Sequence, residues 1–266
     1  MAPAALVRIG VGGALGRMGR VTAGVVGARK DATLAALVDR PDLAGQDCGG
    51  TRLSTLAEAL AACDVIVDFS TPAGSVALAK AAAEHGGPAL VIASTGASED
   101  EGRAIEAAAK TIALVRSGNF SLGVNLLAGL VARAAKTLGP EDWDIEIVEA
   151  HHRRKVDAPS GTALMLGEAA ATGRGVDLRT VEQRARDGLT GPRAAGAIGF
   201  ASLRGGGVVG EHSVVFAAED EIITLSHSAR DRGLFARGAV TAALWVAGKP
   251  PGLYDMMDVL GFNTDG

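Results

Sequence analysis

Short apolar runs alternate with longer amphipathic stretches through the first part of this chain. Strands are predicted at residues 6–11, 33–38, 64–69, 89–93 and 112–115, with helical stretches between them. Strands that alternate with helices indicate a doubly wound parallel sheet. In such sheets ligands bind beyond the carboxyl ends of the strands, so the polar turns after these strands are candidate ligand contacts.

The pattern changes after a long helix predicted at residues 122–138. Strand-like segments follow at 144–148, 198–203, 208–217 and 221–226, and one helix, at 162–171, separates the first two. This order indicates a smaller α+β domain with a mixed or antiparallel sheet. The Gly- and Arg-rich segment 174–193 is expected to be a mobile loop. A helix at 230–247 and the tail at 253–260 are expected to pack back on the first domain.

A glycine-rich turn follows the first predicted strand. Gly13, Gly16 and Gly19 have the spacing G-x-x-G-x-x-G, which permits a tight turn and a close approach to a pyrophosphate. Asp39 ends the second predicted strand about 20 residues later, and Arg40 follows it. An acid there can bind ribose hydroxyls, and an arginine can hold a 2′-phosphate. The sequence therefore predicts a Rossmann-type site for NADH or NADPH, the alternative being a glycine turn that serves packing alone.

These patterns divide the chain into two expected domains. Residues 1–122 with 231–266 are expected to form a dinucleotide-binding domain, and residues 123–230 a substrate-binding and tetramerisation domain.

Two histidines and three cations lie in the segment 149–162, between a predicted strand and a predicted helix. Ser160 is a suitable N-cap, and the first backbone N–H groups of the helix, here those of Gly161 and Thr162, favour an anion. His151 and Lys155 supply charge and protons, because histidine titrates near neutral pH and a crowded lysine can be shifted towards it. The segment therefore suits a small molecule with carboxylates or phosphates. The alternative is a solvated basic loop that ends in an ordinary N-cap.

Composition and charge limit the remaining classes. The chain has 266 residues, is 48% hydrophobic and carries a formal net charge of −4, which argues against a general nucleic-acid or membrane-surface role. Cys48 and Cys63 form no metal-binding pattern and are interpreted as reduced thiols of a cytoplasmic protein. His212 and His227 could line a substrate cleft or serve as structural hydrogen-bonding groups.

The motifs together resemble the 4-hydroxy-tetrahydrodipicolinate reductase family of lysine and diaminopimelate biosynthesis, formerly called dihydrodipicolinate reductase. The resemblance rests first on Glu149-Ala150-His151-His152-x-x-Lys155-x-Asp157-x-Pro159-Ser160-Gly161-Thr162-Ala163. It extends to the glycine turn, to Arg204-Gly205-Gly206 with Gly210-Glu211-His212, and to Tyr254-Asp255-Met256, so that it spans nearly the whole chain.

The resemblance implies a cytoplasmic homotetrameric enzyme that uses NADH or NADPH and a small heterocyclic dicarboxylate. The spacing of histidines, cysteines and carboxylates predicts no metal site, and the net charge predicts no nucleic-acid partner. It implies that His151 is the proton donor and acceptor with Lys155 as its partner, and that His152, Gly161 and Thr162 bind substrate carboxylates. The implied cofactor contacts are Gly13, Ala14, Leu15, Gly16, Arg17, Met18, Asp39, Arg40, Ala93, Ser94, Thr95, Ser117, Gly118, Asn119 and Phe120.

The implied reaction starts with loss of water from the hydroxylated ring to give a conjugated cyclic imine. Hydride reaches the electron-poor end of that system, and His151 or Lys155 protonates the resulting enamine. The sequence departs from the usual family pattern at Ala93 and Ser94, where Gly and Thr are common, and at Asp39, where Glu is common. These departures bear on the choice between NADH and NADPH, and not on the reaction.

Two other functions remain as alternatives. An amino-acid or semialdehyde dehydrogenase on the same scaffold would need a catalytic cysteine or a different donor set, and Cys48 and Cys63 have unsuitable settings. A non-catalytic NADPH-sensing protein would keep the glycine turn and lose the proton donors, whereas His151 and Lys155 are both present.

Overall fold

The computed structural model describes residues 5–47 and 50–263, which form two compact units. Unit 1 comprises Met1–Leu122 and Gly233–Gly266, and unit 2 comprises Gly123–Arg232. Cys48, predicted to be a reduced thiol, lies outside the described residues. Cys63 is a buried free thiol.

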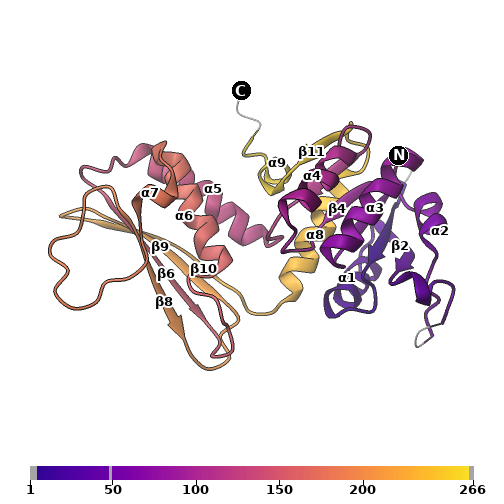
Figure 1. Cartoon of the computed structure of the whole chain (residues 1–266), viewed down its shortest axis with the longest axis horizontal. Helices are drawn as coiled ribbons and strands as arrows, with labels where there is room; N and C mark the ends of the chain where they lie inside the picture. The colour runs from indigo at the N-terminus through magenta and orange to yellow at the C-terminus, as the bar shows by residue number, and fades with distance from the viewer. Residues whose placement is uncertain (1–4, 48–49, 264–266) are drawn as a thin grey trace. The chain divides into compact units, whose positions relative to one another are not determined.

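Unit 1 is built on a six-stranded parallel sheet with the strand order β11-β5-β4-β3-β1-β2 (Figure 1). The strands are β1 (Val7–Gly12), β2 (Ala32–Val38), β3 (Val65–Asp68), β4 (Ala89–Ile92), β5 (Ala113–Arg116) and β11 (Gly252–Tyr254). The helices are α1 (Arg17–Gly27), α2 (Leu56–Ala62), α3 (Pro72–His85), α4 (Glu99–Ala108), α8 (Gly233–Val246) and α9 (Met256–Leu260), with the 3-10 turn η1 (Pro41–Leu43). This arrangement confirms the predicted doubly wound sheet.

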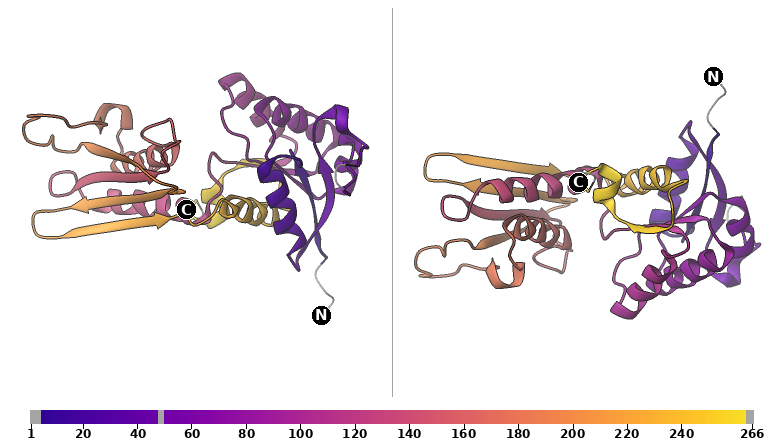
Figure 2. Two further views of the ribbon diagram at one scale, coloured as in Figure 1. Left: turned by 90° about the horizontal axis from the view of Figure 1, so that it is seen from below. Right: turned by 90° about the horizontal axis from the view of Figure 1, so that it is seen from above.

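Helices cover both faces of this sheet, as Figure 2 shows. One core joins the sheet to α1 and α8 through Ile9, Val26, Val67 and Val240, and the other joins it to α2, α3 and α4 through Ile66, Leu78, Leu90 and Ile105. All four residues of β3 are buried, as expected of a central parallel strand. The tail returns to this unit as predicted, because β11 pairs in parallel with β5.

Unit 2 contains a five-stranded mixed sheet with the order β10-β9-β6-β8-β7. The strands are β6 (Asp144–His151), β7 (Glu182–Gln183), β8 (Ile198–Arg204), β9 (Glu211–Ala217) and β10 (Ile222–Ser228), and the helices are α5 (Leu122–Thr137), α6 (Gly161–Arg174) and α7 (Leu178–Val181). β6 pairs in parallel with β8 and antiparallel with β9, which confirms the predicted mixed sheet.

One face of this sheet forms the core of unit 2. Residues of β6 alternate between partly exposed and buried, with Ile145, Ile147, Glu149 and His151 on the buried face. Helix α6 packs there so closely that a Cβ on Gly167 would lie 2.6 Å from the Phe200 ring. Figure 1 shows the helices of unit 2 on one side of its strands.

Two predictions need correction. The segment predicted as a mobile loop, 174–193, contains the end of α6, all of α7 and strand β7. Its Arg186 and Arg193 both bond the carboxylate of Glu146, at 2.7 Å and 2.9 Å, because charge pairing organises a stretch that has little apolar pattern. The strand predicted at 144–148 runs on to His151, so the first histidine of the motif lies on a strand and not in a loop.

Candidate active site

The glycine-rich turn lies between β1 and α1 and is shaped by contacts that only glycine permits. Gly13 has φ +67°, and a Cβ on it would lie 2.9 Å from the carbonyl oxygen of Phe69. A Cβ on Gly19 would lie 2.1 Å from the carbonyl oxygen of Gly13, so the first turn of α1 packs directly on the loop. Helix α1 begins at Arg17, with Gly16 as its N-cap, so the glycines themselves form its entry.

Asp39 closes this turn from the neighbouring strand end. Its Oδ2 accepts a hydrogen bond from the backbone N–H of Leu15 at 2.8 Å, and its Oδ1 accepts one from the backbone N–H of Arg40 at 2.9 Å. The guanidinium of Arg40 is exposed and lies 3.8 Å from the carboxylate of Asp42. The acid and the glycine turn therefore meet, as the fingerprint predicts.

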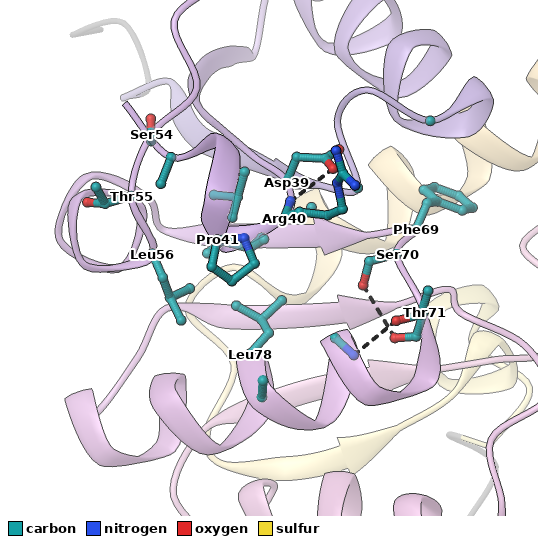
Figure 3. Close-up of a pocket in the computed structure, with 18 residues that line it drawn as sticks. Asp39, Arg40, Pro41, Ser54, Thr55, Leu56, Phe69, Ser70, Thr71 and Leu78 are labelled. Carbon is teal, nitrogen blue, oxygen red and sulfur yellow. Dashed lines mark hydrogen bonds between the residues drawn. The ribbon is translucent and has the colours of Figure 1, made fainter. Parts of the chain in front are cut away.

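A cavity of about 720 Å³ lies beside these residues (Figure 3). Gly12, Gly13, Gly16, Asp39 and Arg40 line it, and its other walls come mainly from apolar side chains of β2, β3, α2 and α3, with Ser70 and Thr71 at the end of β3. An apolar slot beside a carboxylate and a glycine-lined helix start suits an adenosine with its attached phosphates. We call it the dinucleotide pocket.

The other predicted cofactor contacts sit at the ends of the adjacent strands. Ala93, Ser94 and Thr95 follow β4, and Ser117, Gly118, Asn119 and Phe120 follow β5. Ala93 and Phe120 are buried, Ser94 is half-buried, and Thr95 and Gly118 are exposed. Because β4 and β5 follow β3 in the sheet, both turns lie on the carboxyl edge that the dinucleotide pocket occupies.

The second candidate region belongs entirely to unit 2 and is centred on His151, the last residue of β6. Nδ1 of His151 lies 2.5 Å from Oε2 of Glu149, and both side chains are almost fully buried. Arg204 donates two hydrogen bonds to the same carboxylate, at 2.8 Å and 2.7 Å, from the end of β8. We call these three residues, with Ser160 and His212, the histidine–carboxylate cluster.

Opposing influences set the ionisation of the Glu149–His151 pair. Burial would raise the pKa of Glu149, but hydrogen bonds from Arg204, Ser202 and His151 outweigh it and hold the pKa at about 2. Burial lowers the pKa of His151, and Glu149 opposes this shift through its hydrogen bond and its charge. The ionised carboxylate holds a proton on Nδ1, which leaves Nε2 as the nitrogen that can exchange a proton with a ligand.

A glycine, Gly210, lies next to Nε2 of His151. A Cβ on Gly210 would lie 3.1 Å from Nε2 of His151, so any larger residue there would crowd this nitrogen. Gly210 immediately precedes β9 and is fixed by the bond from the N–H of Ala229 to its carbonyl oxygen, at 2.9 Å.

The start of α6 is tied to the same carboxylate. Ser160 caps the helix as predicted, its hydroxyl accepting from the N–H of Ala163, and its own N–H donates to Oε1 of Glu149 at 3.2 Å. Gly161 is exposed and Thr162 half-buried at this helix start. The helix end that favours an anion therefore lies beside the histidine that can exchange a proton.

The other members of the predicted motif are distributed around this centre. Nζ of Lys155 lies 2.9 Å from Oδ1 of Asp157, and this pairing lowers the pKa of Asp157. His152 is half-buried, while Arg153, Arg154 and Val156 are exposed. Lys155 also acts on the histidine, because its charge contributes to the lowered pKa of His151.

His212 lies against both the proton-exchanging histidine and the helix start. Its ring centroid is 5.0 Å from that of His151, and its Nε2 is 3.2 Å from Oγ of Ser160. Burial lowers its pKa to about 4, with a further contribution from His151, so it is neutral near pH 7. His227 is its register partner on β10. Their Nδ1 atoms are buried without a hydrogen-bond partner within the described part of the chain.

Sequence reasoning missed the supporting part of this cluster. The link from Glu149 to His151 could have been found, since residues two apart on a strand share a face. Arg204 and His212 meet Glu149 and His151 only through the parallel β8 and the antiparallel β9, which sequence spacing does not reveal. The bond from the N–H of Ser160, the predicted N-cap, to Glu149 is likewise a tertiary contact.

Within residues 5–47 and 50–263, no group of three or more His, Cys, Asp or Glu residues could hold a metal ion. In the same ranges, no helix has the length and apolar character needed to cross a bilayer.

Comparison with known proteins gives matches along both units. The family model "Dihydrodipicolinate reductase, N-terminus" matches residues 7–120, and "Dihydrodipicolinate reductase, C-terminus" matches residues 123–260. A 4-hydroxy-tetrahydrodipicolinate reductase of Caulobacter vibrioides is 61% identical over 97% of this chain and 98% of the relative. That of Rhizobium rhizogenes is 52% identical, again over 97% of this chain and 98% of the relative.

Solved structures share the fold at low identity. A dipicolinate-bound dihydrodipicolinate reductase from Paenisporosarcina sp. TG-14 superposes with a TM-score of 0.78 at 23% identity, over 96% of this chain and 99% of the other. A probable dehydrogenase from Thermotoga maritima gives a TM-score of 0.61 at 14% identity, over 96% and 93% of the two chains.

Proposed function

The chain belongs to the dihydrodipicolinate reductase family, and we propose that it reduces 4-hydroxy-tetrahydrodipicolinate, through the dehydrated cyclic imine, to tetrahydrodipicolinate. This is an NAD(P)H-dependent step of lysine and diaminopimelate biosynthesis. The observation that carries the proposal is the buried Glu149–His151 pair beside the start of α6, because it joins a proton-exchanging group to an anion site.

The residues of unit 1 fit a reduced nicotinamide dinucleotide. Gly13, Gly16 and Gly19 leave room for a pyrophosphate at the start of α1, and Asp39 offers carboxylate oxygens at the adenosine end. The proposed contacts are those predicted from the sequence, with residues 93–95 and 117–120 at the nicotinamide half. When bound, the cofactor supplies the hydride. Asp39 and Arg40 together support use of both NADH and NADPH.

The start of α6 is the proposed anchor for the two carboxylates of the substrate. The backbone N–H groups of Gly161 and Thr162 lie at the positive end of a 14-residue helix. His152 adds a polar side chain from the loop before it. The printed description of the Paenisporosarcina structure names bound dipicolinate, a molecule of the same dicarboxylate class.

His151 is the proposed proton donor, with Lys155 as its partner. Glu149 fixes the ring of His151 through Nδ1, and Arg204 keeps the Glu149 carboxylate ionised. A proton on Nε2 of His151 can then pass to the enamine that hydride transfer leaves on the substrate ring. Burial, and after it the positive charges of Lys155 and Arg204, lower the pKa of His151, which makes it a readier donor. Ring reduction then ends with a product that keeps both carboxylates on an uncharged ring, and with a histidine that solvent reprotonates.

The two alternative functions have less support. A cysteine-dependent dehydrogenase needs a thiolate, whereas burial raises the pKa of Cys63 to about 11. A non-catalytic sensor would have no use for a carboxylate that orients a histidine, and Glu149 is buried and bonded for that purpose.

Unit 1 is the proposed cofactor-binding domain, and unit 2 is the proposed substrate-binding and tetramerisation domain. The sheet face of unit 2 opposite α6 carries Val148, Ala150, Ala201, Leu203 and Val215, and Leu203 is 58% exposed. The apolar side chains of this face, which also carries Glu146, Ser213 and Glu211, support assembly into a homotetramer. A biosynthetic role supports a cytoplasmic location. The molar mass in solution, compared with that of Leu203→Glu, tests the assembly.

A coupled spectrophotometric assay tests the proposed function. Absorbance of the reduced nicotinamide should fall only when the 4-hydroxy-tetrahydrodipicolinate substrate is supplied, and the assay is run with NADH and with NADPH. Reduction of the oxidised cofactor by a semialdehyde or an amino acid instead, or binding of cofactor without turnover, would favour one of the two alternatives.

A further inference from the structure

Three polar side chains are linked in unit 1, and the proposed function uses only the last of them, Ser94. Asp68, the last residue of β3, is 1% exposed, and Ser75, in the first turns of α3, is fully buried. The hydroxyl of Ser75 hydrogen-bonds to Oδ2 of Asp68 and lies 2.7 Å from Oγ of Ser94, in the turn after β4. The chain therefore runs from a carboxyl group inside the sheet to a proposed nicotinamide contact.

Among the residues that the structure describes, no charged group compensates the buried carboxyl group of Asp68. Both of its hydrogen-bond partners are neutral: Oδ1 accepts from the N–H of Ser70 at 3.1 Å, and Oδ2 meets the Ser75 hydroxyl. Removing a carboxylate from water with only neutral partners disfavours ionisation, and burial accordingly raises the pKa of Asp68.

The glycine turn gives an independent reason for a neutral group at this position. Gly12 is the register partner of Asp68, and a Cβ on Gly12 would lie 2.5 Å from Oδ1 of Asp68. Gly12 leads directly into the turn that should hold the pyrophosphate. A buried negative charge so close to a bound dianion would repel it in a medium of low dielectric constant.

We propose that neutral Asp68 is a positioning residue that, through Ser75, turns the Ser94 hydroxyl into a hydrogen-bond donor towards the nicotinamide half of the cofactor. Ser75 donates to Oδ2 when the carboxylate is ionised, but a proton on Asp68 reverses this bond, so that Asp68 donates to Ser75 and Ser75 donates its only proton to Ser94. Ser94 must accept on that side, so its own proton is available to an acceptor such as the carboxamide oxygen or a ribose oxygen. This inference rests on the proposed function, since Ser94 is assigned to the cofactor there.

The test measures the dissociation constants of NADH and NADPH for the full chain by cofactor fluorescence, with thermal unfolding of each variant alongside. Ser75→Ala and Ser94→Ala should each weaken binding by about five-fold, the effect of one neutral hydrogen bond. The double variant should bind no worse than the weaker single variant, because both changes break one chain. Asp68→Asn should bind within about two-fold of the wild type, since its amide donates to Ser75 as the neutral acid does.

Two results would overturn the proposal. One is wild-type affinity in Ser75→Ala, and the other is a loss in Asp68→Asn as large as that in Ser75→Ala, which would mean that an ionised Asp68 is needed. Ser98→Ala is the matched control, because it removes the N-cap of α4 and should lower stability without changing affinity. Failure of the proposed function itself would show separately, as a wild-type chain that binds a cofactor but does not oxidise it when the 4-hydroxy-tetrahydrodipicolinate substrate is supplied.

Discussion

Glu149 and His151 lie two residues apart on the buried face of β6, with Oε2 of Glu149 2.5 Å from Nδ1 of His151. Glu149 and His151 are close in sequence, but the residues that surround this pair come from distant segments. Arg204 from β8 neutralises the carboxylate, and the N–H of Ser160 ties it to the start of α6. One buried carboxylate therefore orients the proposed proton donor and the proposed anion site together.

Loss of either proton-bearing group should affect turnover far more than cofactor binding. His151→Gln and Lys155→Ala are each expected to lower kcat by about 10²–10⁴-fold, because a positioned proton donor contributes that much. The dissociation constant of NADH should stay within about two-fold, since unit 1 supplies the proposed contacts. Steady-state kinetics and fluorescence titration measure the two effects. His85→Gln and Lys136→Ala, both exposed, are the controls, and near-normal kcat in His151→Gln and Lys155→Ala would refute the assignment.

Removing the orienting carboxylate should shift the pH dependence of turnover. Glu149 raises the pKa of His151, so in Glu149→Gln that pKa falls further below its ordinary value. A donor must be protonated, and the decline of kcat on the alkaline side should therefore begin at a lower pH. The rate at the optimum should fall by about 10–100-fold, as for other orienting partners of histidine. A pH–rate profile measures both, with exposed Glu168→Gln as the control. An unshifted alkaline limb would contradict the orienting role.

The Glu149 carboxylate should make the stability of the fold depend on pH in the acidic range. The pKa of Glu149 is about 2 in the folded chain against an ordinary 4.5, so its ionised form stabilises the fold above about pH 4.5. That contribution is lost as the pH falls from 4.5 towards 2. Thermal unfolding midpoints of wild type and Glu149→Gln should therefore converge over this interval. A difference that stays constant with pH would show that the carboxylate is not preferentially ionised in the folded state.

Two glycines of α1 should respond in opposite ways to the same substitution. Gly19→Ala places a Cβ 2.1 Å from the carbonyl oxygen of Gly13, so it should distort the turn and weaken cofactor binding by about ten-fold or more. Gly24→Ala meets nothing within 4 Å and should stabilise the chain by about 0.5–1 kcal/mol with unchanged affinity. Chemical unfolding and fluorescence titration distinguish them. If Gly19→Ala bound the cofactor as tightly as Gly24→Ala, the glycine turn would lose its support as a cofactor site.

The anion site at the start of α6 should depend on a backbone donor. Thr162→Pro removes one N–H group near the helix start and should raise KM for the substrate by about 10–100-fold, the range for a hydrogen bond to a charged group. Thr162→Ala keeps that N–H and serves as the matched control. Initial rates at varied substrate concentration give KM for each. A proline variant with the KM of the alanine variant would mean that the carboxylates are held elsewhere.

Much of the fold could be predicted because periodicity is a local property. The buried strand β3, the capping box at Ser98 and Glu101, and the glycine turn before α1 each result from neighbouring residues. The segment 174–193 was misjudged because its order comes from Arg186 and Arg193 reaching Glu146 on another strand. Long-range charge pairs leave no trace in local pattern.

The sequence by itself determined the chemical groups of this protein: a glycine turn with an acid after it, and a histidine, a lysine and a helix start within a few residues. Tertiary structure alone decided how those groups act. Arg204 and His212 reach His151 through the register of β8 and β9, and Ser75 links Asp68 to Ser94 from a helix between two strands. The physical reason is that hydrogen bonds and ionisation respond to distance and burial, which pairing between remote segments creates.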